Sequence, residues 1–147
     1  MRSQVRAIFA VLGIALVAAC NDSTAVNGDA SGTYTLSAIN GAALPFTLQA
    51  TTTDTLVITA GNIVINTDGT FVETLTADET AGGVKTTQTN VCPGSYIQQG
   101  NAFTFNENVT GDANCGGSYG ARWDGANTVS LLFTGYTLDY TKAAATL

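Results

Sequence analysis

The stretch GTYTLSAINGAALPFTL, residues 32–48, alternates apolar and polar side chains around an Asn-Gly pair. Tyr34 and Leu36 share one parity, and threonine or serine fills the other, which is the period of a half-buried β-strand. Asn40 and Gly41 predict a tight hairpin turn, because both residues tolerate the positive φ angles that such a turn requires. The stretch therefore predicts two antiparallel strands that share one apolar face.

The same pattern continues along the chain, with turn residues such as Asp68-Gly69 between the apolar runs. Asp78 and Glu79 are placed at a hairpin tip, and Ala60-Gly61-Asn62 separates two β-branched runs. The expected strands cover residues 33–38, 46–49, 56–58, 63–65, 71–76, 86–91, 95–98, 103–105, 119–123, 129–133 and 136–140. Some of these runs are short enough to merge, so we expect eight to ten strands.

No segment after residue 31 has helical apolar spacing over three turns, so the fold class is all-β. Strands joined by short turns predict an antiparallel up-and-down meander, and a meander of this length must hide its edges. We therefore predict a closed or nearly closed barrel over residues 32–142, followed by a tail at 143–147. A two-sheet β-sandwich is the alternative.

The N-terminal leader combines Arg2 and Arg6 with an uncharged, mostly apolar run from Ala7 to Ala19. Thirteen helical residues rise about 20 Å, which is shorter than the roughly 30 Å hydrocarbon core of a bilayer. A positive start, a short apolar helix and small final residues are typical of a secretory signal peptide. Residues 1–19 are thus predicted to be a signal-peptide helix.

The leader ends in Leu16-Val17-Ala18-Ala19-Cys20, which resembles the lipobox of bacterial lipoproteins. The resemblance implies cleavage before Cys20, acylation of that cysteine with chains such as palmitate, and anchoring to a membrane of the bacterial cell envelope. Several acyl chains give stable anchoring where one does not. The alternative is an ordinary signal peptide that is cut after Ala19. The polar residues up to position 31 are expected to form a flexible tether.

Three stretches of the expected barrel carry a resemblance to a known family: GTYTLSAINGAALPFTL at 32–48, INTDGTF at 65–71 and GSYIQQGNAFTF at 94–105. Together they resemble the opening strand and the hairpins of lipocalin-like small lipoproteins, with Tyr34 where lipocalins place tryptophan. The resemblance implies a calycin-like barrel, a fold that holds small apolar ligands.

Cys92 and Cys115 are the two cysteines that remain if Cys20 carries lipid. Export to an oxidising compartment favours a disulfide between them. We expect it to join the loop before Ser95 to the loop before Ser118, and to stabilise the fold by about 3 kcal/mol.

Composition argues against several classes of function. The chain has no histidine, so the usual general base and the commonest metal ligand are missing, and we expect no catalytic residue, no metal and no cofactor. After the leader, three cations face eleven acids, a net charge of −8 that disfavours nucleic-acid binding. Oxygen-rich stretches at 66–70 and 106–117 suit calcium, but turns require the same residues, and we favour turns.

We expect the candidate ligand cavity to lie in the barrel interior, where inward-facing side chains line it. Glu73 shares the parity of its apolar neighbours, so it is either a buried polar contact for a ligand or evidence of a β-bulge, and we favour the bulge. For Trp123 and the five tyrosines we favour core filling over a cavity lining. The predicted cavity residues are Tyr34, Phe71, Phe103, Phe105, Leu131 and Leu138.

The sequence thus predicts a lipid-anchored barrel that binds a small apolar ligand in the cell envelope without being an enzyme. The alternative is an envelope lipoprotein with a filled core, which acts through its surface. The sequence identifies no ligand and no protein partner, and it does not distinguish the inner from the outer membrane.

Overall fold

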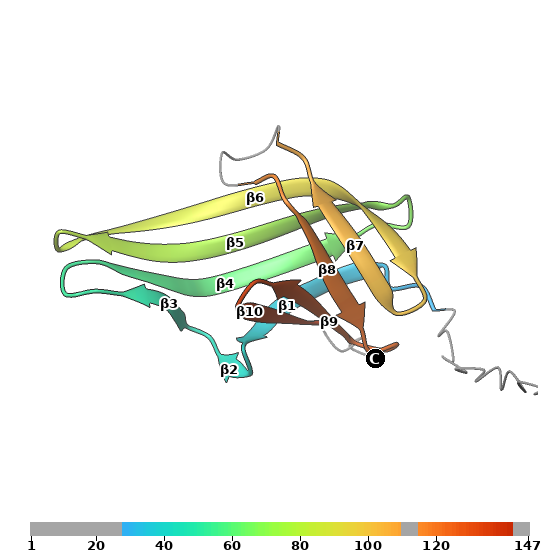
Figure 1. The fold of residues 1–147 in the computed structure, drawn as a ribbon, viewed down its shortest axis with the longest axis horizontal. Coiled ribbons are helices and arrows are strands. Elements are labelled where there is room, and N and C mark those ends of the chain that lie inside the picture. The colour runs from blue at the N-terminus through green and yellow to red at the C-terminus, as the bar shows by residue number, and fades with distance from the viewer. Residues whose placement is uncertain (1–27, 110–114, 143–147) are drawn as a thin grey trace, which may run out of the picture.

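A computed structural model of the chain describes residues 28–109 and 115–142. The predicted signal-peptide helix, the lipobox with Cys20 and the tail at 143–147 lie outside the described residues. Ten antiparallel strands make up the described part (Figure 1). They are β1 (Gly32–Ile39), β2 (Ala42–Ala43), β3 (Phe46–Ala50), β4 (Thr55–Ile65), β5 (Thr70–Ala81), β6 (Val84–Gln99), β7 (Ala102–Glu107), β8 (Ser118–Trp123), β9 (Thr128–Phe133) and β10 (Tyr136–Lys142).

Eight of these strands close into a barrel, as predicted. The sheet runs β1-β10-β9-β8-β7-β6-β5-β4, and β1 also pairs with β4 through the register Gly32↔Ile65 to Thr35↔Asn62. The short strand β2 pairs with the end of β1, and β3 pairs with the first half of β4. Closure rules out the sandwich alternative, because each of the eight barrel strands has a neighbour on both sides along the barrel wall.

The turn predicted at Asn40-Gly41 is present, but the strand that pairs back onto β1 is the two-residue β2, and the predicted strand at 46–49 is β3, which pairs with β4 instead. Asn40 has φ 51° and Gly41 has φ 76°, and the flanking strands pair through Ile39↔Ala42. Asn40 is the only non-glycine residue with positive φ among the described residues, which agrees with the tolerance of asparagine for this region. This turn, together with Asp68-Gly69, shows that local turn chemistry located the strand ends correctly.

The separation predicted at Ala60-Gly61-Asn62 is wrong, because β4 runs through it as one strand with a register shift between Ile58 and Ala60. Gly61 lies in the strand interior for a packing reason. A Cβ at this position would lie 2.8 Å from Leu75 Cδ2 and 3.1 Å from Leu36 Cβ. The glycine therefore marks close approach of neighbouring side chains rather than a turn.

Likewise, the runs predicted at 86–91 and 95–98 form one strand, β6, which continues through Pro93. The carbonyl oxygen of Pro93 accepts a hydrogen bond of 2.8 Å from the Asn108 N–H. Its ring nitrogen therefore faces Asn108, the residue just after β7, so the missing N–H removes only a bond at the end of the β6–β7 ladder. A proline is tolerated in this long strand because the neighbour on that side stops at Glu107.

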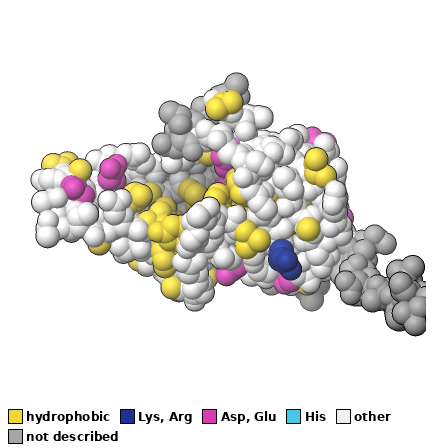
Figure 2. All heavy atoms as spheres, viewed as in Figure 1, with side chains coloured by type: hydrophobic (Ala, Val, Ile, Leu, Met, Phe, Trp, Pro, Cys, Tyr) yellow, Lys and Arg dark blue, Asp and Glu magenta, His cyan; other side chains and the backbone are white. Residues whose placement is uncertain are grey.

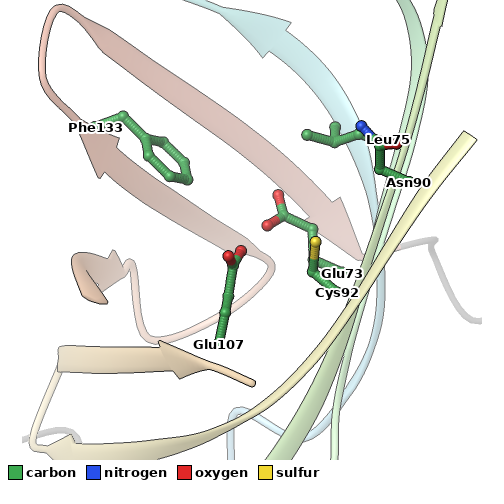
Figure 3. Close-up of a pocket in the computed structure, with 6 residues that line it drawn as sticks. All are labelled: Glu73, Leu75, Asn90, Cys92, Glu107 and Phe133. Carbon is green, nitrogen blue, oxygen red and sulfur yellow. The ribbon is translucent and has the colours of Figure 1, made fainter. Parts of the chain in front are cut away.

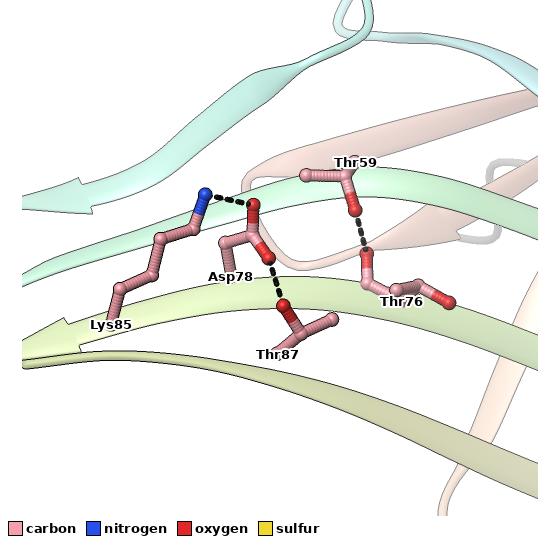
Figure 4. A network of polar contacts seen from close by, with 5 residues as sticks. All are labelled: Thr59, Thr76, Asp78, Lys85 and Thr87. Atoms are coloured by element: carbon pink, nitrogen blue, oxygen red, sulfur yellow. Dashed lines mark hydrogen bonds and ion pairs between the residues drawn. The ribbon is translucent and has the colours of Figure 1, made fainter.

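Strands β5 and β6 form a long hairpin that extends beyond the barrel wall, with its tip at Gly82-Gly83 (Figure 1). The placement of Asp78 and Glu79 at the tip is therefore wrong, because both lie within β5. Asp78 accepts a hydrogen bond of 2.7 Å from Thr87 Oγ1 and forms an ion pair of 2.9 Å with Lys85 (Figure 4). These cross-strand contacts join the two strands of the hairpin near its tip.

The end of the barrel where β1 begins is closed by the residues that precede it. Ala30 is 1% exposed, and its carbonyl oxygen accepts a hydrogen bond of 2.7 Å from the Tyr34 hydroxyl. Lys142 Nζ donates to Ser31 O at 2.7 Å and lies 5.5 Å from the centre of the Tyr34 ring. Residues 28–31 thus belong to the folded domain rather than to the predicted tether.

Candidate functional site

The middle of the barrel is filled by its own side chains. All six predicted cavity residues point inward and are at most 7% exposed. However, of the six only Leu138 is among the residues that line the pockets described below. The prediction was correct in orientation but wrong in location, because the interior of an eight-stranded barrel is about as wide as the side chains it encloses.

Aromatic rings account for much of this filling. Phe71 meets Phe105 edge-on with ring centres 4.7 Å apart, and Phe103 stacks on Phe105 at 5.5 Å. The prediction that aromatic residues fill the core is confirmed for Tyr34, Tyr119, Trp123 and Tyr140, each at most 8% exposed. Tyr96 and Tyr136 are half-buried and pack against this core.

The opposite end, where β9 turns into β10 and β5 leaves the barrel, contains three adjoining pockets that share Leu75. We call them together the mouth hollow. Figure 2 shows hydrophobic side chains gathered around a hollow between the long hairpin and the rest of the barrel. The apolar pocket, of about 240 Å³, is lined by Ile39, Leu48, Ile58, Leu75, Phe133, Tyr136 and Leu138.

The hairpin pocket, of about 380 Å³, is more polar and extends along the inner face of the hairpin. It shares Leu48, Ile58 and Leu75 with the apolar pocket, and its other lining residues are Leu56, Ala77, Glu79, Gln88 and Asn90. Gln88 Nε2 donates to Glu79 Oε2 at 2.9 Å. The shared lining shows that a ligand could extend from one pocket into the other.

The inner pocket, of about 170 Å³, is the part of the hollow closest to the filled core. Its lining is Glu73, Leu75, Asn90, Cys92, Glu107 and Phe133, and Figure 3 shows the carboxyl groups of Glu73 and Glu107 reaching into the same space. Leu75 and Phe133 connect it to the apolar pocket. The hollow therefore has an apolar part and a part that carries two carboxyl groups.

Glu73 is the buried acid of the described chain, at 3% exposure. The Tyr119 hydroxyl donates to its Oε2 at 3.0 Å, and the Tyr140 hydroxyl donates to its Oε1 at 2.5 Å. The β5 register is unbroken from Phe71 to Leu75, so the bulge that we favoured for Glu73 is wrong there, and Glu73 is buried as its parity indicated. Two tyrosines, contributed by β8 and β10, make the burial possible.

The environment of Glu73 works against its ionised form. Burial raises the pKa of the Glu73 carboxyl, while the hydrogen bonds from Tyr140 and Tyr119 oppose this rise and the charge of Glu107 adds to it. The pKa values of Tyr119 and Tyr140 are also raised, first by burial and then by the charge of Glu73, so both hydroxyls stay protonated donors. The carboxyl is therefore held in a fixed orientation by two neutral donors.

The predicted disulfide between Cys92 and Cys115 is present, with Cα atoms 5.4 Å apart. Cys92 lies within β6 rather than in a loop, because that strand is longer than expected, whereas Cys115 precedes β8. The bridge connects the wall of the inner pocket to the segment that follows β7. Glu107 is fixed from the same segment, since its Oε2 accepts a hydrogen bond of 2.9 Å from the Gly116 N–H.

Most residues of the mouth hollow were not predicted as site residues. Leu75 has the parity of Phe71 and could have been included on that ground. Glu107 and Phe133 lie at strand ends, where alternation says little about which way a side chain points. The hollow brings together β1, β3, β4, β5, β6, β7, β9 and β10, so its lining depends on how the barrel closes.

Within residues 28–109 and 115–142, no three or more acidic, cysteine or histidine side chains gather as a metal site would require. The same residues contain no helix that could cross a membrane. The chain matches none of the family models, curated proteins or solved structures with which we compared it. Its function must therefore be inferred from its own residues and their geometry.

Proposed function

We propose that this chain is a lipoprotein of the bacterial cell envelope whose barrel binds a small hydrophobic ligand in the mouth hollow. The apolar pocket is the observation that carries the proposal. Its seven lining side chains are all hydrophobic or aromatic, and its volume of about 240 Å³ is somewhat below the roughly 300 Å³ at which small-molecule pockets usually begin. The adjoining pockets extend the space available to a longer ligand.

The anchor in this proposal is Cys20, at the end of the lipobox-like run. Residues 28–31 pack against the closed end of the barrel, at the Tyr34 end of β1. The mouth hollow lies at the other end, next to Ile39. An anchor at Cys20 would thus attach the domain at the end remote from the hollow, which would leave the opening free to exchange ligand.

The composition and the polar groups favour binding over catalysis. The two carboxyl groups of the inner pocket are accompanied by tyrosine hydroxyls and an amide, without a histidine to serve as a base near neutral pH. Glu73 is held by two hydrogen bonds, which suits a group that orients a ligand. We therefore propose no reaction for this site.

A second candidate function is an interaction role at the envelope, in which the hollow takes no ligand. The observation that favours it is the protruding β5–β6 hairpin, whose exposed residues include Val84 at 68% and Val91 at 45%. From Val84 to Thr89, β6 pairs with β5 alone among the described strands, so this part of the hairpin offers an edge for pairing with another chain.

Mass spectrometry of protein purified from its own membrane tests the proposed function as a whole. The expected result is a mature chain that begins at an acylated Cys20, two fewer hydrogens from one disulfide, and a retained small molecule released on denaturation. An N-terminus at an unmodified Cys20 would contradict the anchor. Ligand-free protein with no small molecule recoverable from gently extracted membranes would favour the interaction role.

A further inference from the structure

We propose, building on the proposed function, that the ligand is an amphipathic amine: its ammonium group binds between Glu73 and Glu107, and its apolar tail lies in the apolar pocket. The inner and apolar pockets share Leu75 and Phe133, so a single molecule can occupy both. The proposal specifies a cationic head group, which separates this chain from carriers of fatty acids or neutral alcohols.

The first step is the orientation of the two acids. Glu73 comes from β5 and Glu107 from β7, and both carboxyl groups are directed into the inner pocket (Figure 3). Each carboxyl oxygen of Glu73 accepts one hydrogen bond from a tyrosine, and an ionised carboxylate oxygen can accept about two. Glu73 therefore retains capacity to accept from a ligand without giving up its tyrosines.

The second step is charge complementarity. All cations of the described residues are placed elsewhere: Lys85 is paired with Asp78 near the hairpin tip, and Lys142 is bound to Ser31 O at the closed end. Arg122 lies opposite Ala102 in the backbone pairing of β7 with β8, at that same closed end, and its side chain is exposed. The two acids would repel a ligand carboxylate, and no cation lies nearby to bind it. An ammonium group would be attracted by both acids.

The third step is the fit of the ammonium group. It presents three donors, enough to reach both carboxyl groups and one further acceptor in the pocket. Phe133 lines the same pocket and packs on Tyr119 with ring centres 4.5 Å apart, so aromatic rings border the space into which the two acids point. The apolar pocket then offers only hydrophobic and aromatic side chains to the tail.

Binding should also move a proton. The groups that face Glu73 are Tyr119 from β8, Tyr140 from β10 and Glu107 from β7, while Cys92 of β6 is held in the disulfide. Burial raises the pKa of Glu73, and an adjacent ammonium group lowers it again. Where Glu73 is protonated in the free protein, amine binding releases that proton to solvent, and affinity rises with pH.

The test uses the full-length lipoprotein in phosphatidylcholine nanodiscs, with empty nanodiscs as the blank. Decylammonium, decanol and decanoate share one tail and differ in the head group, so calorimetric titration with each isolates the head-group preference. We expect saturable binding of decylammonium at least about 10-fold tighter than that of decanol, and none measurable for decanoate. Titration in buffers of different ionisation enthalpy should report proton release.

Two isosteric variants and one control show which residues cause the preference for the ammonium head group. Glu73→Gln should reduce the ratio of decylammonium to decanol affinity to near one, and Glu107→Gln should reduce it in part. Asp139→Asn removes the same charge from the outer surface, where the remaining amide oxygen can still accept from Ser130 Oγ, and should keep the ratio of the unmodified protein. Circular dichroism checks that each variant is folded. If Glu73→Gln does not fold, Glu107→Gln decides the question.

Each possible result has a distinct meaning. Decanol or decanoate binding as tightly as decylammonium would overturn the amine proposal and leave the proposed function intact. An unchanged preference in the glutamine variants would also overturn it. Saturable binding of none of the three probes would contradict the proposed function itself.

Discussion

The Tyr140 hydroxyl donates a hydrogen bond of 2.5 Å to the buried carboxyl group of Glu73, which lies 67 positions earlier in the chain. This contact spans the barrel interior from β10 to β5, beside the second donor Tyr119 on β8. It fixes a carboxyl group at the boundary between the filled core and the mouth hollow. We therefore expect this buried acid to affect how the stability of the domain depends on pH, and the packing beneath it to affect the free energy of unfolding.

Replacement of Glu73 should change how stability depends on pH. Burial raises the pKa of Glu73 above its usual value of 4.5, so the folded state binds more protons than the unfolded state between these two values. The contribution of this group is fully present below about pH 4.5 and is lost as pH rises through the folded-state pKa, by at most about 1.4 kcal/mol per pH unit.

Urea unfolding at a series of pH values measures this effect. The Glu73→Gln variant should lose the decline with rising pH, so its free energy of unfolding should improve relative to the unmodified protein as pH increases. Asp139→Asn serves as the charge-matched control and should keep the decline. Parallel pH profiles for the unmodified protein and Glu73→Gln would contradict this account of the buried carboxyl.

Gly94 tests the packing beneath the hollow. A Cβ at this position would lie 2.3 Å from the Asn106 carbonyl oxygen and 2.5 Å from Phe71 Cε1, so backbone and ring would both have to move. We expect Gly94→Ala to lower the free energy of unfolding by about 1–3 kcal/mol. Gly120→Ala is the matched control, because its nearest contact would be the Phe103 carbonyl oxygen at 3.9 Å.

Equal stabilities of these two alanine variants would show that β6 and β7 are not packed as closely as described. Thermal unfolding followed by circular dichroism is sufficient for the comparison, since both glycines lie in strands and neither has positive φ.

Loss of the Cys92–Cys115 bridge should destabilise the barrel. The bridge closes a loop with a sequence separation of 23, for which the chain-entropy relation gives about 3 kcal/mol. The double variant Cys92→Ala/Cys115→Ala should unfold at correspondingly lower urea concentration, and dithiothreitol should shift the unmodified protein but leave the variant unchanged. A reductant effect of equal size on both proteins would show that the bridge is not its cause.

The period-two pattern and the turn residues are local properties of the chain, and they were sufficient to predict the strands. Short turns between successive strands then predicted the barrel. Gly61 and Pro93 misled the prediction of strand ends, since each has its residue type for a reason outside its own strand. The orientation of Phe71 and Phe105 followed from alternation. The position of the hollow did not, because it depends on where eight strands leave space unfilled.

Glu73 illustrates the same limit at the candidate site. Its parity indicated burial, but a buried acid is unfavourable without partners, and its partners Tyr119 and Tyr140 lie 46 and 67 positions away. The bulge was the more economical interpretation of the sequence alone. Only the closed barrel brings the two hydroxyls to one carboxyl group.

Membrane attachment through Cys20 can be tested independently of the barrel. Cys20→Ser removes the thiol that would accept lipid, so the protein should move from the detergent-soluble membrane fraction to an aqueous fraction after cell fractionation. Ser23→Ala is a neighbouring control that leaves Cys20 in place, and this variant should remain with the membrane. Membrane partition of the Cys20→Ser protein equal to that of the unmodified protein would contradict lipid anchoring.

The central claim, that a ligand binds in the mouth hollow, is tested most directly by photolabelling and peptide mapping. Full-length protein in nanodiscs is irradiated with a decyl probe that carries a diazirine at the end of its tail, with and without excess unlabelled probe. We predict saturable label on peptides that contain Leu48, Phe133 or Tyr136, removed by the competitor. Label that grows in proportion to probe, resists competition or falls mainly outside these peptides would contradict the claim.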